Sequence, residues 1–144
     1  MACFLAPSDY VRWADGDPLA KKAAELVAKD GMGTLRAIYG FVAGVKYDYA
    51  KADRLRGTKG YKPDLAETFE SMSGICVDKA ALMVAMLRSV GIESKLITGT
   101  LDDVPHAWVS AKVEGRWRRC DPTMSPPWDE AEMCRHKYVA RHQR

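Results

Sequence analysis

The spacing of apolar residues predicts two amphipathic helices in the first third of the chain. The first begins at Pro18, with Asp17 as its N-cap, and ends before Gly31, because proline suits the first helical position and glycine commonly follows the last one. The second runs from about residue 35 to 45 and is weakened by its glycines. The apolar faces consist of Leu19, Ala23, Leu26 and Val27 in the first helix, and of Leu35, Ile38 and Val42 in the second.

A polar, turn-rich segment follows, KYDYAKADRLRGTKGYKP at residues 46–63. It carries six Lys and Arg residues against two Asp, and this pattern favours a solvated loop over an anion-binding site. Directly after it, Asp64 and Glu67 have the spacing of a capping box. This motif predicts a short helix that starts near residue 65.

The stretch SGICVDKAALM, residues 73–83, places a cysteine at the start of a predicted buried helix. Ser73 is the expected N-cap and Gly91 supplies the stop. Cys76 lies in the first turn, where free backbone N–H groups and the helix dipole favour the thiolate. The alternative interpretation is a small apolar residue that heads a buried stripe, and position alone does not decide. The stripe consists of Cys76, Ala80, Met83, Val84 and Leu87.

A strand and then a β-hairpin are expected downstream of this helix. In HAWVSAKV, residues 106–113, apolar residues alternate with His106 and Trp108, so the two sets lie on opposite faces. A two-residue loop at Glu114-Gly115 pairs residue 113 with 116, and hence 108 with 121 and 106 with 123. His106 and Asp121 then share a face at a backbone separation of about 7 Å, which their side chains can close. A three-residue bulged loop would separate them.

Cys76, His106 and Asp121 together match the requirements of nucleophilic acyl transfer. The reaction needs a thiolate, a base that takes and returns its proton, and a group that fixes the imidazole tautomer. Each residue alone has an ordinary structural explanation, as a core thiol, a strand-end histidine and a turn aspartate. The combination favours a catalytic role over three separate structural ones.

Size and composition restrict the classes of protein to which this chain could belong. With 144 residues, 47% hydrophobic and 28% charged, the chain has the composition of one soluble globular domain, here expected to span residues 1–144. A net charge of +3 is too small to imply a nucleic-acid partner, and no apolar run has the length of a membrane span. No motif suggests a cofactor, and the oligomeric state is left open.

The cysteines and the first residues bear on the cellular compartment. The four cysteines include no CxxC pair, so reduced thiols are the default interpretation, although a Cys76–Cys120 bridge remains open. The start, MACFLAPSDY, lacks the basic and apolar regions of a signal peptide, which favours the cytoplasm; a chain from which a leader had been removed would look the same.

Three segments, GICVDKAALMVAMLRSVGI, HAWV and RWRRCDPT, closely resemble the transglutaminase-like superfamily. They match its pattern of a Gly-x-Cys helix, a His-Ala-Trp strand and a Trp-x-x-x-Asp-Pro-Thr strand. The resemblance covers mainly residues 35–124 and includes the upstream KYDY. It implies a papain-like α+β fold in which N-terminal helices and a Cys-bearing helix pack on an antiparallel sheet. Lys79 departs from the aromatic or small residue common there, and nothing resembles the calcium loops or added β-domains of the large animal enzymes.

The resemblance also implies roles for individual residues. Cys76 becomes the nucleophile, His106 the general base and acid, and Asp121 the orienting carboxylate. Gly74 and Trp108 are expected to line the site, although plain packing explains Trp108 equally well. The backbone N–H of Cys76 would meet the oxyanion, with a second donor that the sequence does not identify.

The function expected from this chemistry is acyl transfer from peptide or glutamine-type amides through a thioester on Cys76. Hydrolysis is favoured over protein cross-linking, because a cationic loop at 46–62 beside the site would repel a protonated lysine; the position of that loop is implied by the resemblance. The partner is then a peptide or protein substrate. The alternatives are a cross-linking transglutaminase, a non-catalytic binding module on the same fold, an acetyltransferase, and a zinc site formed by Cys76, His106 and Cys120.

Overall fold

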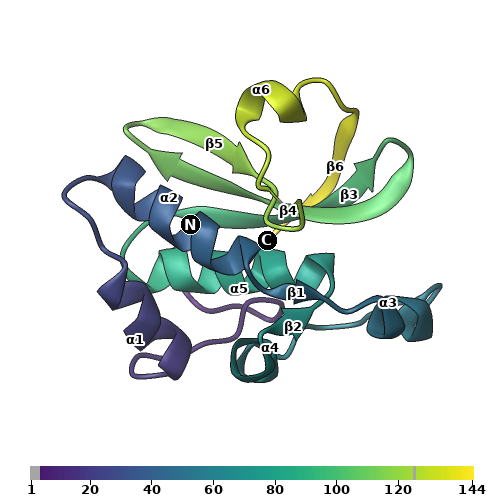
Figure 1. Ribbon diagram of the computed structural model, residues 1–144, viewed down its shortest axis with the longest axis horizontal. Coiled ribbons are helices and arrows are strands. Elements are labelled where there is room, and N and C mark those ends of the chain that lie inside the picture. The colour runs from purple at the N-terminus through teal and green to yellow at the C-terminus, as the bar shows by residue number, and fades with distance from the viewer. Residues whose placement is uncertain (1–3, 125) are drawn as a thin grey trace.

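A four-stranded antiparallel sheet and one central helix organise the chain (Figure 1). This computed structural model describes residues 4–124 and 126–144. The helices are α1 (Pro18–Glu25), α2 (Gly31–Ala43), α3 (Tyr49–Leu55), α4 (Leu65–Ser71), α5 (Cys76–Ser89) and α6 (Glu130–Met133). The strands are β1 (Lys46–Tyr47), β2 (Ser73–Gly74), β3 (Ser94–Leu101), β4 (Val104–Val113), β5 (Arg116–Cys120) and β6 (Tyr138–Gln143).

The sheet has the strand order β5-β4-β3-β6, and β1 and β2 form a separate parallel pair. Helices α1, α2, α4 and α5 lie on one side of the sheet and α6 on the other (Figure 1). The predicted α+β class, with helices packed on an antiparallel sheet, is confirmed.

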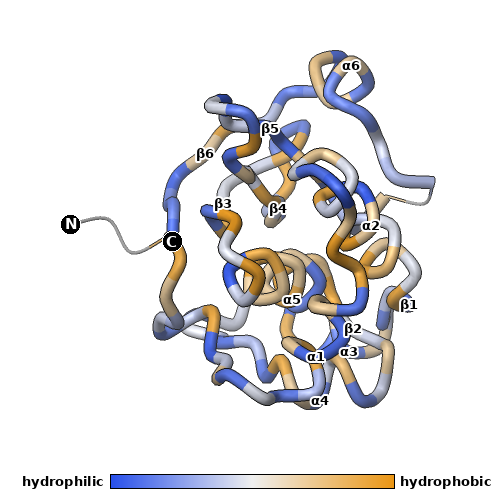
Figure 2. The backbone as a smooth tube through the Cα atoms, turned by 90° about the vertical axis from the view of Figure 1, so that its left-hand side faces the viewer, coloured by the Kyte–Doolittle hydropathy of each residue, from blue (hydrophilic) through white to orange (hydrophobic). Residues whose placement is uncertain are grey.

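Helix α5 is the centre of the hydrophobic core. All its residues from Asp78 to Arg88 are buried, and Figure 2 shows it end-on between the strands and the surrounding helices α1, α2 and α4. The single apolar stripe expected from the sequence understates this burial. A helix that is enclosed on every side needs apolar or internally paired residues all around it, which explains its run of Ala, Leu and Met.

The boundary between the first two helices was predicted wrongly. Helix α1 begins at Pro18 as expected but ends at Glu25, and Gly31 is the first residue of α2 rather than a stop signal. The reason is a cap: the Asp30 side chain accepts a hydrogen bond of 2.7 Å from the Gly33 N–H. This cap starts α2 four residues earlier than its apolar pattern indicates.

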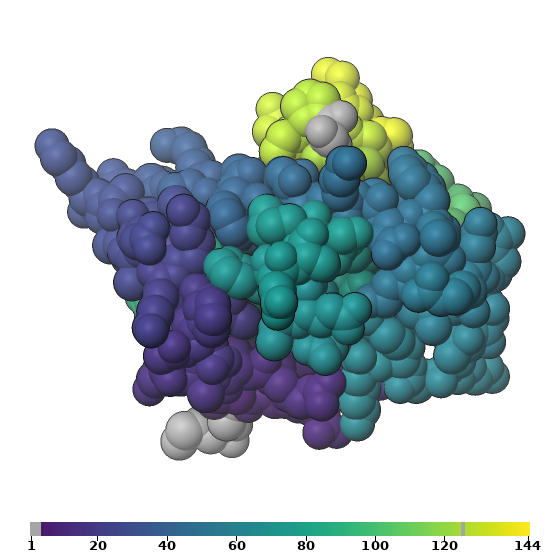
Figure 3. All heavy atoms as spheres, turned by 60° about the horizontal axis from the view of Figure 1, so that its bottom comes forward, coloured from purple at the N-terminus to yellow at the C-terminus, as the bar shows by residue number. Residues whose placement is uncertain are grey.

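The segment 46–63 is also more structured than predicted. It contains β1 and helix α3, which projects at one flank of the molecule (Figure 1) and buries none of its residues. Figure 3 shows this segment in blue beside the teal surface of α4. Asp48 caps α3 by accepting a hydrogen bond of 2.9 Å from the Lys51 N–H. The charged pattern concealed the helix because α3 has no apolar face.

Of two helix N-termini predicted near the central helix, the structure confirms one and corrects the cap of the other. The predicted short helix after Asp64 is confirmed, with the Asp64 carboxylate accepting from the Glu67 N–H at 3.2 Å. Ser73 was predicted as the N-cap of the cysteine helix, and this is wrong. Ser73 lies in β2, and α5 begins at Cys76, where the Asp78 carboxylate accepts a hydrogen bond of 2.9 Å from the Ile75 N–H.

The hairpin formed by β4 and β5 has the predicted register. Val113 pairs with Arg116 and Val109 with Cys120, and the loop is Glu114-Gly115, with positive φ at both residues. A two-residue loop of this kind matches the twist of the flanking strands. Asp121 follows directly after β5, so the register carries it to the same sheet face as His106.

Candidate active site

His106 and Asp121 are in direct contact. His106 Nε2 lies 2.8 Å from Asp121 Oδ2. The His106 side chain is 10% exposed and the Asp121 side chain is fully buried. The contact that was expected from the hairpin register is therefore confirmed.

Two tyrosines that the sequence gave no reason to single out hold Asp121 in place. Tyr138, from β6, donates a hydrogen bond of 2.6 Å to Asp121 Oδ2. The Tyr39 hydroxyl accepts from the Asp121 N–H at 3.1 Å and donates to the Trp128 carbonyl at 2.7 Å. The Thr123 N–H donates to the other carboxylate oxygen at 3.2 Å. Both carboxylate oxygens are thus engaged, which fixes the side chain against rotation.

Cys76 and His106 line one open cleft of about 370 Å³, the Cys76 cleft. Cys76 is a half-buried free thiol at the first position of α5. The cleft is walled by the start of α5, by β3 and β4, by the end of the chain, by Tyr10, and by α3 with the loop after it. Its lining residues include Leu55, Thr58, Gly60, Tyr61, Ile75, Val77, Thr98, Gly99, Pro105, Ala107, His142 and Arg144.

The surroundings of His106 favour its protonated form. Burial lowers the pKa of His106, but hydrogen bonds with the side chains of Asp121 and Cys76 outweigh it and raise the pKa from 6.5 to about 9. At neutral pH the ring is therefore largely imidazolium. The protonated ring lies beside Cys76 in the cleft and can give its proton to a leaving group.

The other described cysteines lack this environment. Cys120 faces the helical core, and burial, together with the nearby carboxylates Glu130 and Asp121, raises the pKa of its thiol to about 12. Cys134 is exposed and contacts Arg119. Cys76, Cys120 and Cys134 are all free thiols, so the Cys76–Cys120 bridge is not formed. Cys3 lies outside the described residues.

The expected site-lining residues Trp108 and Gly74 are not among the described residues that line the cleft. Trp108 is 2% exposed and stacks beside His106, with 6.3 Å between ring centroids. Gly74 is buried in β2, where a Cβ would lie 2.8 Å from the Asp78 Cβ. Trp108 thus packs behind the imidazole. Gly74 has no side chain, and this leaves room for Asp78 at the start of α5.

Asp78 anchors the cleft wall that α3 and its loop provide. Its fully buried carboxylate accepts hydrogen bonds from Lys51 Nζ at 2.8 Å, from the Tyr61 hydroxyl at 2.6 Å and from the Ile75 N–H. One carboxylate therefore caps the cysteine helix and ties two parts of the 46–63 segment to it. The signal in the sequence was an acidic residue at the third position of a helix, the place that a capping box uses.

Tyr47 lies against the backbone of the nucleophile candidate. Burial raises the pKa of Tyr47, and a hydrogen bond with the Cys76 backbone opposes the rise. Its hydroxyl is thus protonated at neutral pH and next to the first peptide unit of α5. The KYDY segment contained this residue, but its approach to Cys76 depends on the parallel pairing of β1 with β2.

The model of the transglutaminase-like superfamily matches residues 20–122. This chain belongs to that superfamily.

Individual relatives match this transglutaminase-like chain in sequence or in structure over part of their length. An uncharacterized protein of Mycobacterium leprae, ML0607, is 30% identical over 94 residues, which is 57% of this chain and 33% of that protein. A crystal structure from Cytophaga hutchinsonii described as a "putative cysteine protease" has a TM-score of 0.66 and 22% identity, over 98% of this chain and 53% of the other. A structure described as a TGase has a TM-score of 0.59 and 19% identity, over 73% of this chain and 29% of the other.

The chain thus spans about a third of its curated relative and about half of the Cytophaga hutchinsonii structure. At these identities the likeness to solved structures shows the fold, which is the transglutaminase-like, papain-like one that was expected.

Lys79, which departs from the usual residue of the family, has a structural role. Its side chain is buried, and its Nζ donates to the carbonyls of Val45 at 2.7 Å and Ala43 at 3.3 Å. Burial lowers the pKa of Lys79, opposed by the charge of Asp121. The ammonium group satisfies carbonyls at and just after the end of α2 and so joins this part of the chain to the first turn of α5.

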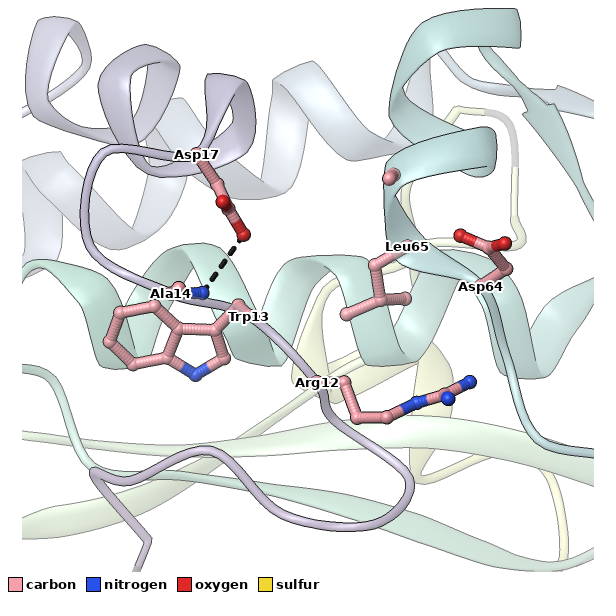
Figure 4. A pocket seen from close by; sticks show the side chains of 7 residues that line it. Arg12, Trp13, Ala14, Asp17, Asp64 and Leu65 are labelled. Atoms are coloured by element: carbon pink, nitrogen blue, oxygen red, sulfur yellow. Dashed lines mark hydrogen bonds between the residues drawn. The ribbon is translucent and has the colours of Figure 1, made fainter.

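A second hollow of about 400 Å³ lies away from this site, between the segment before α1 and the start of α4 (Figure 4). Arg12, Trp13 and Leu65 are among its lining residues, and Cys76, His106 and Asp121 are not. In the part of the chain that the structure describes, no three His, Cys, Asp or Glu side chains are grouped so that they could hold a metal ion. Among those same residues, no helix is both long and apolar enough to cross a membrane.

Proposed function

We propose that this chain is a cysteine-dependent acyl-transfer enzyme that acts on peptide or glutamine-type amides through a thioester on Cys76. The observation that carries the proposal is the position of His106. It is hydrogen-bonded to a buried carboxylate on one side and shares the open cleft with a helix-N-terminal thiol on the other. A nucleophile, a proton carrier and an orienting group in one place are what acyl transfer needs.

The first half of the reaction forms the thioester. The Cys76 thiolate attacks the amide carbonyl, a C–S bond forms, and the carbonyl electron pair moves onto oxygen. When this intermediate collapses, the C–N bond breaks and the imidazolium of His106 gives its proton to the leaving amine. A largely protonated His106, as its pKa of about 9 implies, is suited to this step.

The second half releases the acyl group. Now neutral, His106 takes a proton from water, the hydroxide attacks the thioester carbonyl, and the Cys76 thiolate departs with the electrons of the C–S bond. Asp121 holds the imidazole in place through both halves. The Tyr47 hydroxyl and the Cys76 N–H are the proposed donors to the oxyanion, because they lie next to one another at the first peptide unit of α5; the oxyanion then replaces the hydrogen bond between Tyr47 and the Cys76 backbone.

Hydrolysis is the proposed outcome, rather than cross-linking. The end of α3 and the loop after it do flank the cleft, but the residues they contribute are Leu55, Thr58, Gly60 and Tyr61, none of which is cationic. Positive charge in the cleft wall comes instead from Arg144. A protonated lysine is disfavoured beside this guanidinium, and water is not.

Incubation with a glutamine-containing peptide and a fluorescent primary amine tests two claims: that the chain catalyses acyl transfer, and that water is the preferred acceptor. We expect conversion of the glutamine to free acid or cleavage of the peptide, with little incorporated amine, and no reaction with the Cys76→Ser variant. Abundant incorporation would make the chain a cross-linking transglutaminase. If neither product forms while the peptide binds, a non-catalytic binding module is the better account.

A further inference from the structure

Arg144 is a cation in the wall of the Cys76 cleft. Its Nη1 donates a hydrogen bond of 3.0 Å to Thr98 Oγ1, and its guanidinium lies 4.2 Å from the centroid of the Tyr10 ring. The Arg144 N–H donates to the Leu96 carbonyl at 2.8 Å, which extends the β3–β6 pairing by one residue. The side chain is thus half-buried and positioned before any ligand arrives.

No carboxylate neutralises this guanidinium among the described residues. Thr98 is its hydrogen-bond acceptor there, which leaves most of its N–H groups uncommitted. Asp9, which shares a neighbouring hollow with Arg144, is paired with Lys62 at 3.0 Å. The described lining of the Cys76 cleft contains no Asp or Glu, and His142 adds a second basic side chain to it.

We propose that Arg144 binds a carboxylate of the substrate next to the scissile amide. This inference rests on the proposed function and names the substrate class for it: peptides with an acidic side chain beside the cleaved or deamidated residue, or with their terminal carboxylate there. The planar fork of arginine binds a carboxylate through two parallel hydrogen bonds, which gives both affinity and orientation. Arg144 is therefore a specificity-determining residue that acts on the bound peptide.

A purely structural Arg144 would behave differently. It would only hold the N-terminal segment against the sheet, through its contacts with Tyr10 and Thr98 and its backbone pairing. Substitution would then lower stability and would affect acidic and neutral peptides equally. The charge of the peptide separates the two interpretations.

The test measures peptide binding to the Cys76→Ala variant by fluorescence anisotropy, so that it does not depend on turnover. Three peptides share one glutamine-centred core: one with blocked ends and a glutamate beside the core, one with blocked ends and a glutamine there, and one with the neutral side chain and a free carboxyl end. We expect Arg144→Gln to weaken binding of a carboxylate-bearing peptide roughly 10- to 100-fold, and to change binding of the blocked neutral one by less than about twofold.

Arg141→Gln is the matched control. Arg141 is an exposed residue of β6, the strand that Arg144 directly follows; it is not among the residues that line the cleft, and its substitution removes the same charge. It should leave all three affinities within about twofold, because long-range steering alone is weak at physiological salt. Arg144→Lys keeps the charge but loses the fork, and should recover part of the affinity. Thermal unfolding of each variant shows whether the fold is retained.

The outcomes separate this inference from the proposed function. Dependence on Arg144 for the glutamate peptide identifies a side-chain carboxylate, and dependence for the free-ended peptide identifies a terminal one. Equal weakening of all three peptides, or no weakening, overturns the inference even if Cys76 is the reactive thiol. Arg144-dependent binding by a chain whose Cys76 does not react would overturn the proposed function and leave the carboxylate site standing.

Discussion

At the scale of single residues, the site is built around a buried charge that is fully engaged. Asp121 has no exposed surface, and its carboxylate interacts with His106, Tyr138 and the Thr123 N–H. A buried carboxylate is costly unless its partners replace water. Here the partners also fix the imidazole, so the same contacts serve stability and orientation.

Replacing Asp121 with Asn should separate orientation from packing. The Asp121→Asn side chain fits the same space and still accepts from Tyr138, but its amide cannot stabilise the imidazolium and presents the wrong hydrogen-bonding group to His106. We expect kcat to fall on the order of 10³-fold or more while the fold is retained. Tyr138→Phe is the control, since it keeps the His106–Asp121 contact; steady-state kinetics on one peptide should show a far smaller loss. Near-normal turnover in Asp121→Asn would contradict the assigned role.

The pKa of His106 makes stability depend on pH in a defined window. The folded protein binds the proton more tightly than the unfolded chain, with a pKa of about 9 against 6.5. The contribution of the pair to stability is therefore complete below pH 6.5 and is lost as the pH rises through about 9. The free energy of unfolding should fall in that window by at most about 1.4 kcal/mol per pH unit.

Urea unfolding across the window measures this slope, and His106→Gln should flatten it because the ionisable group is gone. Superimposable pH profiles of the two proteins would show that His106 is not held in its protonated form.

At the scale of elements, the sequence predicted what short-range rules determine. The hairpin register followed from one two-residue loop, so the His106–Asp121 contact was predictable. The position of Cys76 in the first turn of its helix followed from one helical pattern. The β6 strand was not, because its pairing with β3 joins residues about forty positions apart through antiparallel contacts that no local motif specifies. Tyr138 and Arg144 arrive with that strand, which is why both were missed.

The attachment of α3 to the start of α5 gives an element-scale prediction. Lys51→Met removes the cationic partner of the fully buried Asp78 and should lower the free energy of unfolding by about 3 kcal/mol. Arg56→Met is the control in the same segment, because the Arg56 and Asp53 side chains are 82% and 73% exposed, and exposed pairs contribute little. Chemical denaturation compares them. Equal effects of the two substitutions would mean that Asp78 does not anchor the cleft wall.

At the scale of the whole molecule, the site lies where the helical layer meets the sheet. Cys76 comes from the start of the central helix, His106 from β4, which packs against that helix, and Asp121 from the position directly after β5. The residues that surround this meeting point come from both ends of the chain. The core packing of α5 on the sheet therefore sets the separation of the thiol and the imidazole, and no local loop does so.

The most direct test of a thioester on Cys76 is covalent labelling of the folded protein. A peptide carrying an electrophilic glutamine analogue is added at neutral pH, and the modified residues are mapped by mass spectrometry as a function of time. We predict that Cys76 is labelled first and that His106→Gln slows its labelling. The buried Cys120, with a pKa of about 12, should stay unmodified, and the exposed Cys134 should react slowly. Faster labelling of Cys120 or Cys134 than of Cys76 would contradict the account.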